Sequence, residues 1–211
     1  MVKVKICGIT NWADARDAME AGADFLGFNF YRKSPRYIAP AAARRIVKRL
    51  PQRVSAVGVF VNSTEDEMLL IARSVGLHHL QLHGEESPEV VAQIRQTIPV
   101  IKAVRVRRAF RLSELARFKR ASAFLLDGFD RRARGGTGKT IDWKLARRAG
   151  LHRQIFLAGG ITPENAAMAV SIAKPYAIDV CSGVEKTQGK KDAARMRALI
   201  QAVRPARRKS K

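Results

Sequence analysis

Short apolar runs alternate along the chain with segments in which apolar residues recur at helical spacing. This alternation is typical of parallel β-strands joined by crossover helices. The pattern predicts strands at residues 2–7, 24–28, 55–61, 79–82, 100–104, 123–126, 154–157 and 176–180. It also predicts eight helices, which begin at the cap at 11, at 40, at the cap at 62–64, near 88, after 113, near 142, at 162 and near 192. The first four end near 21, near 50, at 76 and before 99, and the last ends near 203.

Eight strands that alternate with eight helices indicate an α/β protein with a single (β/α)8 TIM barrel over residues 1–203. A doubly wound open sheet is the rival fold, but it usually stops at five or six strands. The dense basic block at residues 204–211 predicts a frayed C-terminal tail.

The net charge of +22 and the pI of about 11.1 make nucleic acid a rival partner, because phosphate neutralisation needs such a surplus. The basic residues are scattered along the predicted helices, which favours a solvated surface over a nucleic-acid site. No apolar run is long enough to span a bilayer, and the N-terminus reads as a strand and not as a signal peptide, so a cytoplasmic protein is expected. Cysteine and histidine lack zinc spacing, and no metal is expected.

Two titratable residues lie where predicted strands 1 and 6 end, at Cys7 and Asp127. Carboxyl ends of barrel strands line the active site, and these two strands lie about three places apart, so the side chains can face each other. A thiol near basic residues can become a thiolate, and a carboxyl group after an apolar run can keep its proton, which together favour proton transfer. The alternative is that Cys7 fills the core and Asp127 serves a turn.

Glycine-rich turns follow predicted strands 6, 7 and 8. Backbone N–H groups in such turns bind phosphate, and the loops after strands 7 and 8 are the recurrent phosphate site of this fold. The candidates are Gly136, Gly138, Gly159, Gly160, Ser182 and Gly183. Glycine also simply permits tight turns, which is the competing interpretation.

The segment 135–140 also invites a P-loop interpretation, but the glycine that this motif needs five places before Gly138 is Ala133. Arg36, in the predicted loop after strand 2, has a guanidinium that could bind a carboxylate through two hydrogen bonds. In a chain this rich in arginine, it could equally be a surface residue.

Motifs that run in order along nearly the whole chain point to one family. They are Lys5-Ile6-Cys7-Gly8-Ile9-Thr10, Ser34-Pro35-Arg36-Tyr37, Gly58-Val59-Phe60, Gln81-Leu82-His83-Gly84, Leu126-Asp127, Gly135-Gly136-Thr137-Gly138 with Asp142-Trp143, Leu157-Ala158-Gly159-Gly160, and Asp179-Val180-Cys181-Ser182-Gly183-Val184-Glu185. Together they resemble the phosphoribosylanthranilate isomerases of tryptophan biosynthesis.

The resemblance implies a (β/α)8 barrel without cofactor or metal that isomerises a small phosphorylated substrate as a monomer or homodimer. It implies that Asp127 is the general acid, that Cys7 is the general base, that Arg36 holds a carboxylate, that His83 contacts the substrate and that the glycine turns hold the phosphate. Cys181 stands where the family usually has serine, so phosphate contacts there should come from backbone N–H groups and Ser182. A related barrel isomerase for a histidine-pathway aminoaldose is the other enzyme considered, but it uses paired aspartates at two strand exits.

Overall fold

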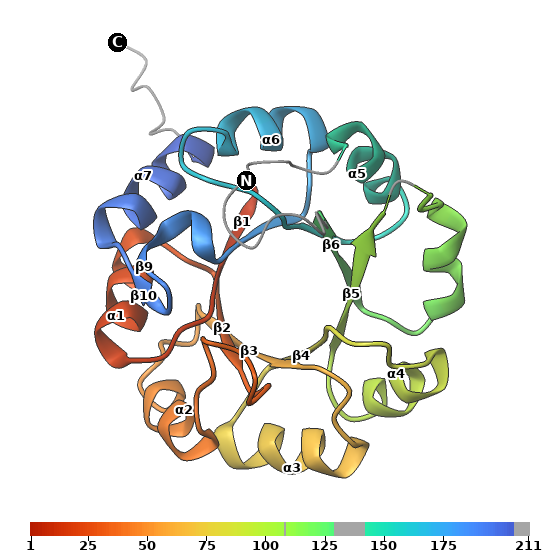
Figure 1. Cartoon of the computed structure of the whole chain (residues 1–211), viewed down its shortest axis with the longest axis horizontal. Coiled ribbons are helices and arrows are strands. Elements are labelled where there is room, and N and C mark those ends of the chain that lie inside the picture. Colours follow the sequence, from red (N-terminus) through yellow and green to blue (C-terminus); the bar gives the residue numbers. More distant parts are fainter. Residues whose placement is uncertain (108, 129–141, 205–211) are drawn as a thin grey trace.

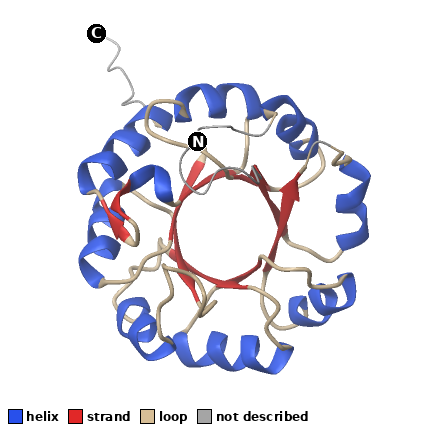
Figure 2. Cartoon of the chain, viewed as in Figure 1, coloured by secondary structure: helices blue, strands red, loops and turns tan. Residues whose placement is uncertain are grey.

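Eight parallel strands close into a barrel in the computed structural model, which describes residues 1–107, 109–128 and 142–204. Each strand pairs with the next along the chain, and the last pairs with the first. Figures 1 and 2 show the strands as an inner ring and the helices as an outer ring. The strands are β1 (Lys3–Cys7), β2 (Phe25–Asn29), β3 (Ser55–Phe60), β4 (His79–Leu82), β5 (Val100–Val106), β6 (Ala123–Gly128), β7 (Ile155–Leu157) and β8 (Ala177–Val180). The predicted TIM barrel is confirmed.

The outer ring holds seven α-helices and one 3-10 helix within the described residues. They are α1 (Trp12–Ala21), α2 (Pro40–Val47), α3 (Glu65–Val75), α4 (Pro88–Arg95), η1 (Leu112–Phe118), α5 (Trp143–Gly150), α6 (Ala166–Ala173) and α7 (Ala193–Val203). The segment after residue 113, predicted as a helix, is thus the 3-10 element η1.

Side-chain caps mark the starts of α1, α3, α4, α5 and α7, and a glycine ends α1 and α3. Asn11 accepts a hydrogen bond from the Asp14 backbone N–H at 2.9 Å at the start of α1, and Gly22 ends that helix in the left-handed region with φ 105°. Helix α6 begins at Ala166, later than the predicted start at Thr162. There Asn165 accepts from the Thr162 N–H at 2.9 Å, so these residues form a turn of their own before the helix.

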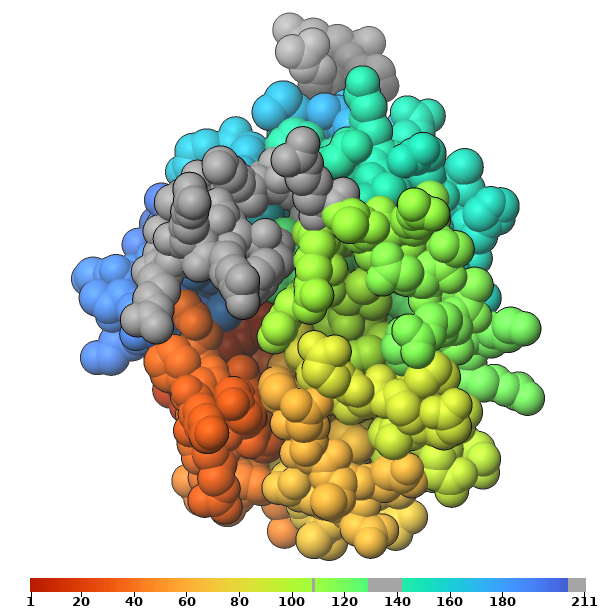
Figure 3. All heavy atoms as spheres, turned by 45° about the vertical axis from the view of Figure 1, so that its right-hand side comes forward, coloured from red at the N-terminus to blue at the C-terminus, as the bar shows by residue number. Residues whose placement is uncertain are grey.

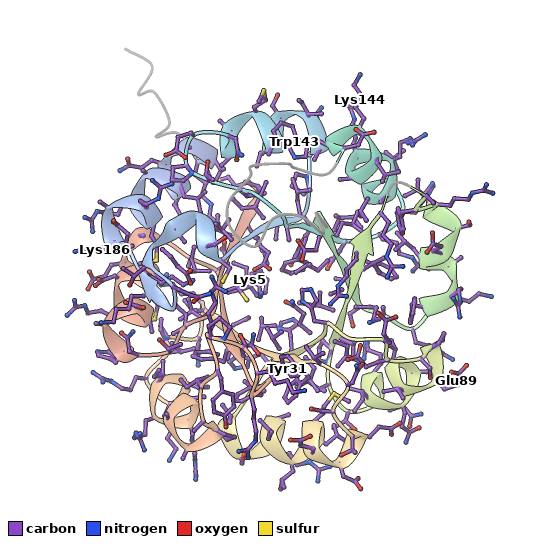
Figure 4. The ribbon with its side chains drawn as sticks, in the orientation of Figure 1. Lys5, Tyr31, Glu89, Trp143, Lys144 and Lys186 are labelled. Atoms are coloured by element: carbon purple, nitrogen blue, oxygen red, sulfur yellow. The ribbon has the colours of Figure 1, made fainter. Side chains whose placement is uncertain are left out.

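The core has two layers because each strand alternates its side chains between two faces. The larger layer lies between the barrel and its helices, and a smaller one fills the barrel interior with residues such as Phe25, Leu125 and Phe156. The interior also contains charge: Lys5 is fully buried and lies opposite Asp179 in the β1–β8 register. Figure 4 shows Lys5 inside the ring of strands.

A small antiparallel hairpin between β8 and α7 is absent from the sequence predictions. It consists of β9 (Glu185–Thr187) and β10 (Lys190–Lys191) and follows a 3-10 turn, η2 (Ser182–Val184). Figure 1 shows it beside α1 and α7. Side-chain and backbone contacts fix it to the start of the chain, because the Thr10 hydroxyl donates to the Gly189 carbonyl at 3.0 Å.

The predicted boundary between barrel and tail lies at Arg204, which caps α7. Its guanidinium donates to the backbone carbonyl of Val2 at 3.1 Å and to that of Gly22 at 2.9 Å, and it pairs with Asp24. The rest of the predicted tail, residues 205–211, lies outside the described residues, so its frayed state stays a prediction.

Among the helices that the structure describes, each is too short or too polar to cross a membrane.

The half-buried imidazole of His79 should make the protein less stable in mild acid. Its Nδ1 is buried and has no hydrogen-bond partner within the described residues. The ring packs edge-on against Phe25, with the two ring centroids 5.7 Å apart. Burial, helped by the charges of His78 and Lys3, lowers the pKa of His79 to about 4. The unfolded chain binds a proton near pH 6.5 and the folded chain near pH 4, so stability falls as pH drops between these values.

We expect the free energy of unfolding to fall by about 1–2 kcal/mol between about pH 8 and pH 5 through this residue, allowing for its partial exposure. Urea titrations at both pH values should show a smaller pH dependence in His79→Gln than in the wild type. The exposed His152 offers a matched control, since His152→Gln should keep the wild-type pH dependence. An unchanged pH dependence in His79→Gln would remove this explanation.

Candidate active site

Cys7 lies at the carboxyl end of β1, only partly buried, with its side chain inside the barrel mouth. The neighbouring strand leaves it space through Gly27. A Cβ at Gly27 would come within 2.7 Å of the Cys7 Sγ and 3.1 Å of the Lys5 Nζ, so the thiol and the ammonium border the same small gap. A larger residue at position 27 would displace the sulfur.

A buried ion pair lies directly beneath this thiol. Lys5 Nζ donates to Asp179 Oδ1 at 2.8 Å, and the two side chains are 0% and 9% exposed. Burial works against the charge of Lys5, but pairing with Asp179 and interaction with Cys7 raise the pKa of this ammonium. Lys5 therefore keeps its charge beside the sulfur.

Burial raises the pKa of the Cys7 thiol, and the ammonium groups of Lys5 and Lys191 oppose that rise. The basic neighbours that the sequence analysis looked for are present, but burial and the nearby Asp179 carboxylate outweigh them, so the pKa of the thiol stays above its ordinary value. The signal for this pair was a charged residue at a buried position in each of two strands, Lys5 in β1 and Asp179 in β8, and sequence reasoning missed it.

Asp127 belongs to β6 itself, one residue before the strand ends, and its side chain is 33% exposed. His83, which follows β4, places its Nε2 at 3.5 Å from Asp127 Oδ2. On the other side of the ring, His83 Nδ1 lies 2.8 Å from the amide Nε2 of Gln81. The structure thus brings the predicted acid and the predicted substrate contact His83 together, with Gln81 fixing the orientation of the imidazole.

A cavity of about 500 Å³ extends from His83 along the loops that follow β4 and β5. In Figure 3 the green and yellow segments that carry these loops stand across a hollow from the orange segment that follows β2. A second buried ion pair supports the wall of the cavity, because Lys102 Nζ lies 2.8 Å from Glu86 Oε2 and also donates to the Gly84 carbonyl at 2.8 Å.

Arg36 reaches from the loop after β2 across the exit of β1. A Cβ at Gly8, the residue after Cys7, would meet Arg36 Cδ at 2.8 Å and Cys181 Sγ at 3.0 Å, so the guanidinium stem crosses directly over this glycine. Arg36 donates from Nε and Nη2 to the two carboxylate oxygens of Glu185, each at 2.7 Å. The predicted carboxylate-binding arginine thus already holds a carboxylate of the protein.

The loops after β7 and β8 press against each other at the other side of the mouth. A Cβ at Gly183 would come within 2.0 Å of the Ile161 carbonyl oxygen, and one at Gly159 within 2.5 Å of the Gly128 nitrogen and 3.1 Å of Asp127 Oδ1. Gly159 also has φ 85°, which side chains rarely adopt. Gly160 and Ser182 are exposed beside them. The predicted phosphate residues Gly159, Gly160, Ser182 and Gly183 therefore share one corner.

Two predicted phosphate residues, Gly136 and Gly138, lie outside the described residues, so their role stays a prediction.

The thiol of Cys181 is mostly buried, and burial raises its pKa to about 12. Lys191 donates to its carbonyl oxygen at 3.1 Å. Among the described residues, no cluster of three or more His, Cys, Asp or Glu side chains is arranged to hold a metal ion.

Comparison with known proteins gives one consistent result. A family model described as N-(5'phosphoribosyl)anthranilate (PRA) isomerase matches residues 4–202. The N-(5'-phosphoribosyl)anthranilate isomerase of Citrifermentans bemidjiense is 51% identical over 200 residues, which are 95% of this chain and 96% of that protein. That of Moorella thermoacetica is 47% identical over 207 residues, covering 98% of this chain and 91% of the relative.

Solved structures agree with the sequence relatives. The crystal structure of phosphoribosyl anthranilate isomerase from Thermotoga maritima superposes with a TM-score of 0.90 at 44% identity, over 96% of this chain and 98% of that one. A phosphoribosyl anthranilate isomerase in complex with reduced 1-(o-carboxyphenylamino)-1-deoxyribulose 5-phosphate superposes with a TM-score of 0.86 at 42% identity and the same coverage.

Proposed function

The chain belongs to the N-(5'-phosphoribosyl)anthranilate isomerase family, and on that premise we propose that Cys7 and Asp127 catalyse its Amadori rearrangement. The substrate is N-(5-phospho-β-D-ribosyl)anthranilate, and the product is 1-(2-carboxyphenylamino)-1-deoxy-D-ribulose 5-phosphate. The observation that carries the assignment is the position of a thiol and a carboxyl group at the ends of β1 and β6, facing one barrel mouth.

In the proposed first step, Asp127 donates its proton to the ring oxygen of the ribose. The C1–O bond breaks, and the nitrogen lone pair forms a Schiff base with C1. His83 supports this role because its Nε2 lies 3.5 Å from the Asp127 carboxyl and can contact a sugar hydroxyl there. In the second step, Cys7 removes the proton from C2, and the resulting enolamine ketonises to the product.

The remaining residues hold the two ends of the substrate. Arg36 would bind the anthranilate carboxylate, and the corner formed by Gly159, Gly160, Ser182 and Gly183 would bind the phosphate through backbone N–H groups.

We also propose that the protein is cytoplasmic and acts without a cofactor. Whether it is a monomer or a homodimer can be measured by light scattering.

A fluorescence assay tests this function directly. The fluorescence of phosphoribosylanthranilate is followed over time, and the purified protein should consume this compound much faster than it hydrolyses in the absence of protein. The histidine-pathway aminoaldose provides a comparison, because β1 ends in cysteine here and not in aspartate. Turnover of the aminoaldose alone, or of neither compound, would overturn the proposal.

A further inference from the structure

Glu185 is nearly buried beside the proposed site, although no step of the proposed reaction uses it. Its side chain is 5% exposed, and its two carboxylate oxygens accept from Nε and Nη2 of Arg36 at 2.7 Å each. Arg36 comes from the loop after β2 and Glu185 from β9, so the pair joins segments 149 residues apart.

A guanidinium group can bind a carboxylate along either of two edges. One edge presents Nε and Nη2, and the other presents Nη1 and Nη2. Glu185 takes the first edge, and the second is not part of that contact. The stem of Arg36 also rests on Gly8, where a Cβ would be only 2.8 Å from Cδ. Glu185 therefore holds the guanidinium by hydrogen bonds, while the aliphatic stem of Arg36 packs over Gly8, the residue after Cys7.

We propose that Glu185 is a positioning residue, which fixes Arg36 so that its Nη1–Nη2 edge meets the carboxylate of the substrate. The inference rests on the proposed function, in which Arg36 binds that carboxylate. A free arginine side chain loses rotamer freedom when it binds, and a side chain that is already held loses less. Glu185 should therefore improve substrate binding without touching the substrate.

Lys191 answers the obvious objection that Glu185 would repel an anionic substrate. Its Nζ lies 3.0 Å from Glu185 Oε1, its side chain is fully buried, and it stands opposite Glu185 in the β9–β10 register. One arginine, one glutamate and one lysine leave a net charge of +1 for the substrate. The Lys191 backbone N–H donates to Asp14 at 3.0 Å, so the hairpin is fixed to α1.

The same contact has an opposite interpretation, in which Glu185 imitates the substrate carboxylate and competes for Arg36. The two interpretations predict opposite effects for Glu185→Gln. An amide offers one acceptor oxygen and turns an NH₂ group toward the guanidinium, so it cannot hold both nitrogens of Arg36. Loss of positioning raises KM for the substrate, whereas loss of competition lowers it.

Steady-state kinetics of Glu185→Gln should be measured with phosphoribosylanthranilate and with N-(5-phosphoribosyl)aniline, which lacks the carboxylate. We expect KM for the natural substrate to rise about tenfold with kcat nearly unchanged, because the lost hydrogen bonds serve binding. KM for the aniline compound should be the same in variant and wild type. Equal increases with both compounds would indicate a general structural role and overturn the inference, as would a lower KM.

The aniline compound also separates this inference from the function beneath it. If the wild type handles both compounds with the same KM, Arg36 does not bind the carboxylate, and the proposed site fails. If the wild type discriminates and Glu185→Gln discriminates equally well, only the role of Glu185 fails. In an Arg36→Ala background, Glu185→Gln should add no further increase in KM.

Two further variants keep the test sound. Glu89→Gln removes a carboxylate that points outward from α4 and should leave both KM values unchanged (Figure 4). If Glu185→Gln does not fold, Glu185→Asp keeps the charge but withdraws the carboxylate from Arg36, and the same increase in KM is expected. Wild-type KM in folded Glu185→Asp would contradict the role.

Discussion

Replacement of Cys7 by serine is expected to lower kcat by about 10²- to 10⁴-fold while the fold is retained. Serine fits the space that Gly27 leaves for the thiol, since oxygen is smaller than sulfur. A hydroxyl, however, gives up its proton far less readily than a thiol. Even for the thiol, burial raises the pKa, and the Lys5 ammonium must favour the anion. The alcohol therefore cannot serve as the base at neutral pH.

The measurement is the fluorescence assay at saturating substrate, with circular dichroism to confirm the fold. Cys181→Ser is the matched control, because it removes the other cysteine and introduces the residue usual in the family. We expect its turnover to stay close to that of the wild type. A Cys7→Ser variant with nearly wild-type kcat would exclude Cys7 as the general base.

Asp127→Asn is expected to cause a loss of similar size, about 10²- to 10⁴-fold in kcat. The amide matches the carboxyl group in shape and can still lie next to His83 Nε2 and Gly159, so substrate binding should persist. An amide has no acidic proton for the ribose ring oxygen, so ring opening should fail. KM should change little, because the lost interaction belongs to the transition state.

Full progress curves and KM measurements for Asp127→Asn test this assignment. Asp66→Asn, on the exposed first turn of α3, is the control for removing an aspartate from this strongly basic protein. A large increase in KM with unchanged kcat in Asp127→Asn would instead assign Asp127 to substrate binding.

Local signals were sufficient for most of the fold and for the positions of the proposed catalytic residues. Apolar runs, helix caps such as Asn11 and helix-ending glycines such as Gly22 act within a few residues, so they can be recognised in the sequence. The end of each barrel strand follows from them, and with it the positions of Cys7 and Asp127.

Contacts between distant segments were the part that sequence reasoning missed. The β9–β10 hairpin is too short and too charged to show an alternating apolar pattern. The element η1 is wound more tightly than an α-helix, a difference that apolar spacing over seven residues does not reveal. Lys5, Asp179, Glu185 and Lys191 carried no role in the prediction, because their partners lie far away in the sequence.

By itself, the sequence determined the order of strands and helices, the family motifs and the residues that stand where strands end. Closure of the barrel decided the rest. When β8 pairs with β1, Asp179 comes opposite Lys5, and the hairpin after β8 brings Glu185 to Arg36. Charge neutralisation and hydrogen-bond geometry act over a few ångströms in space, so these pairs and their effect on Cys7 exist only in the folded ring.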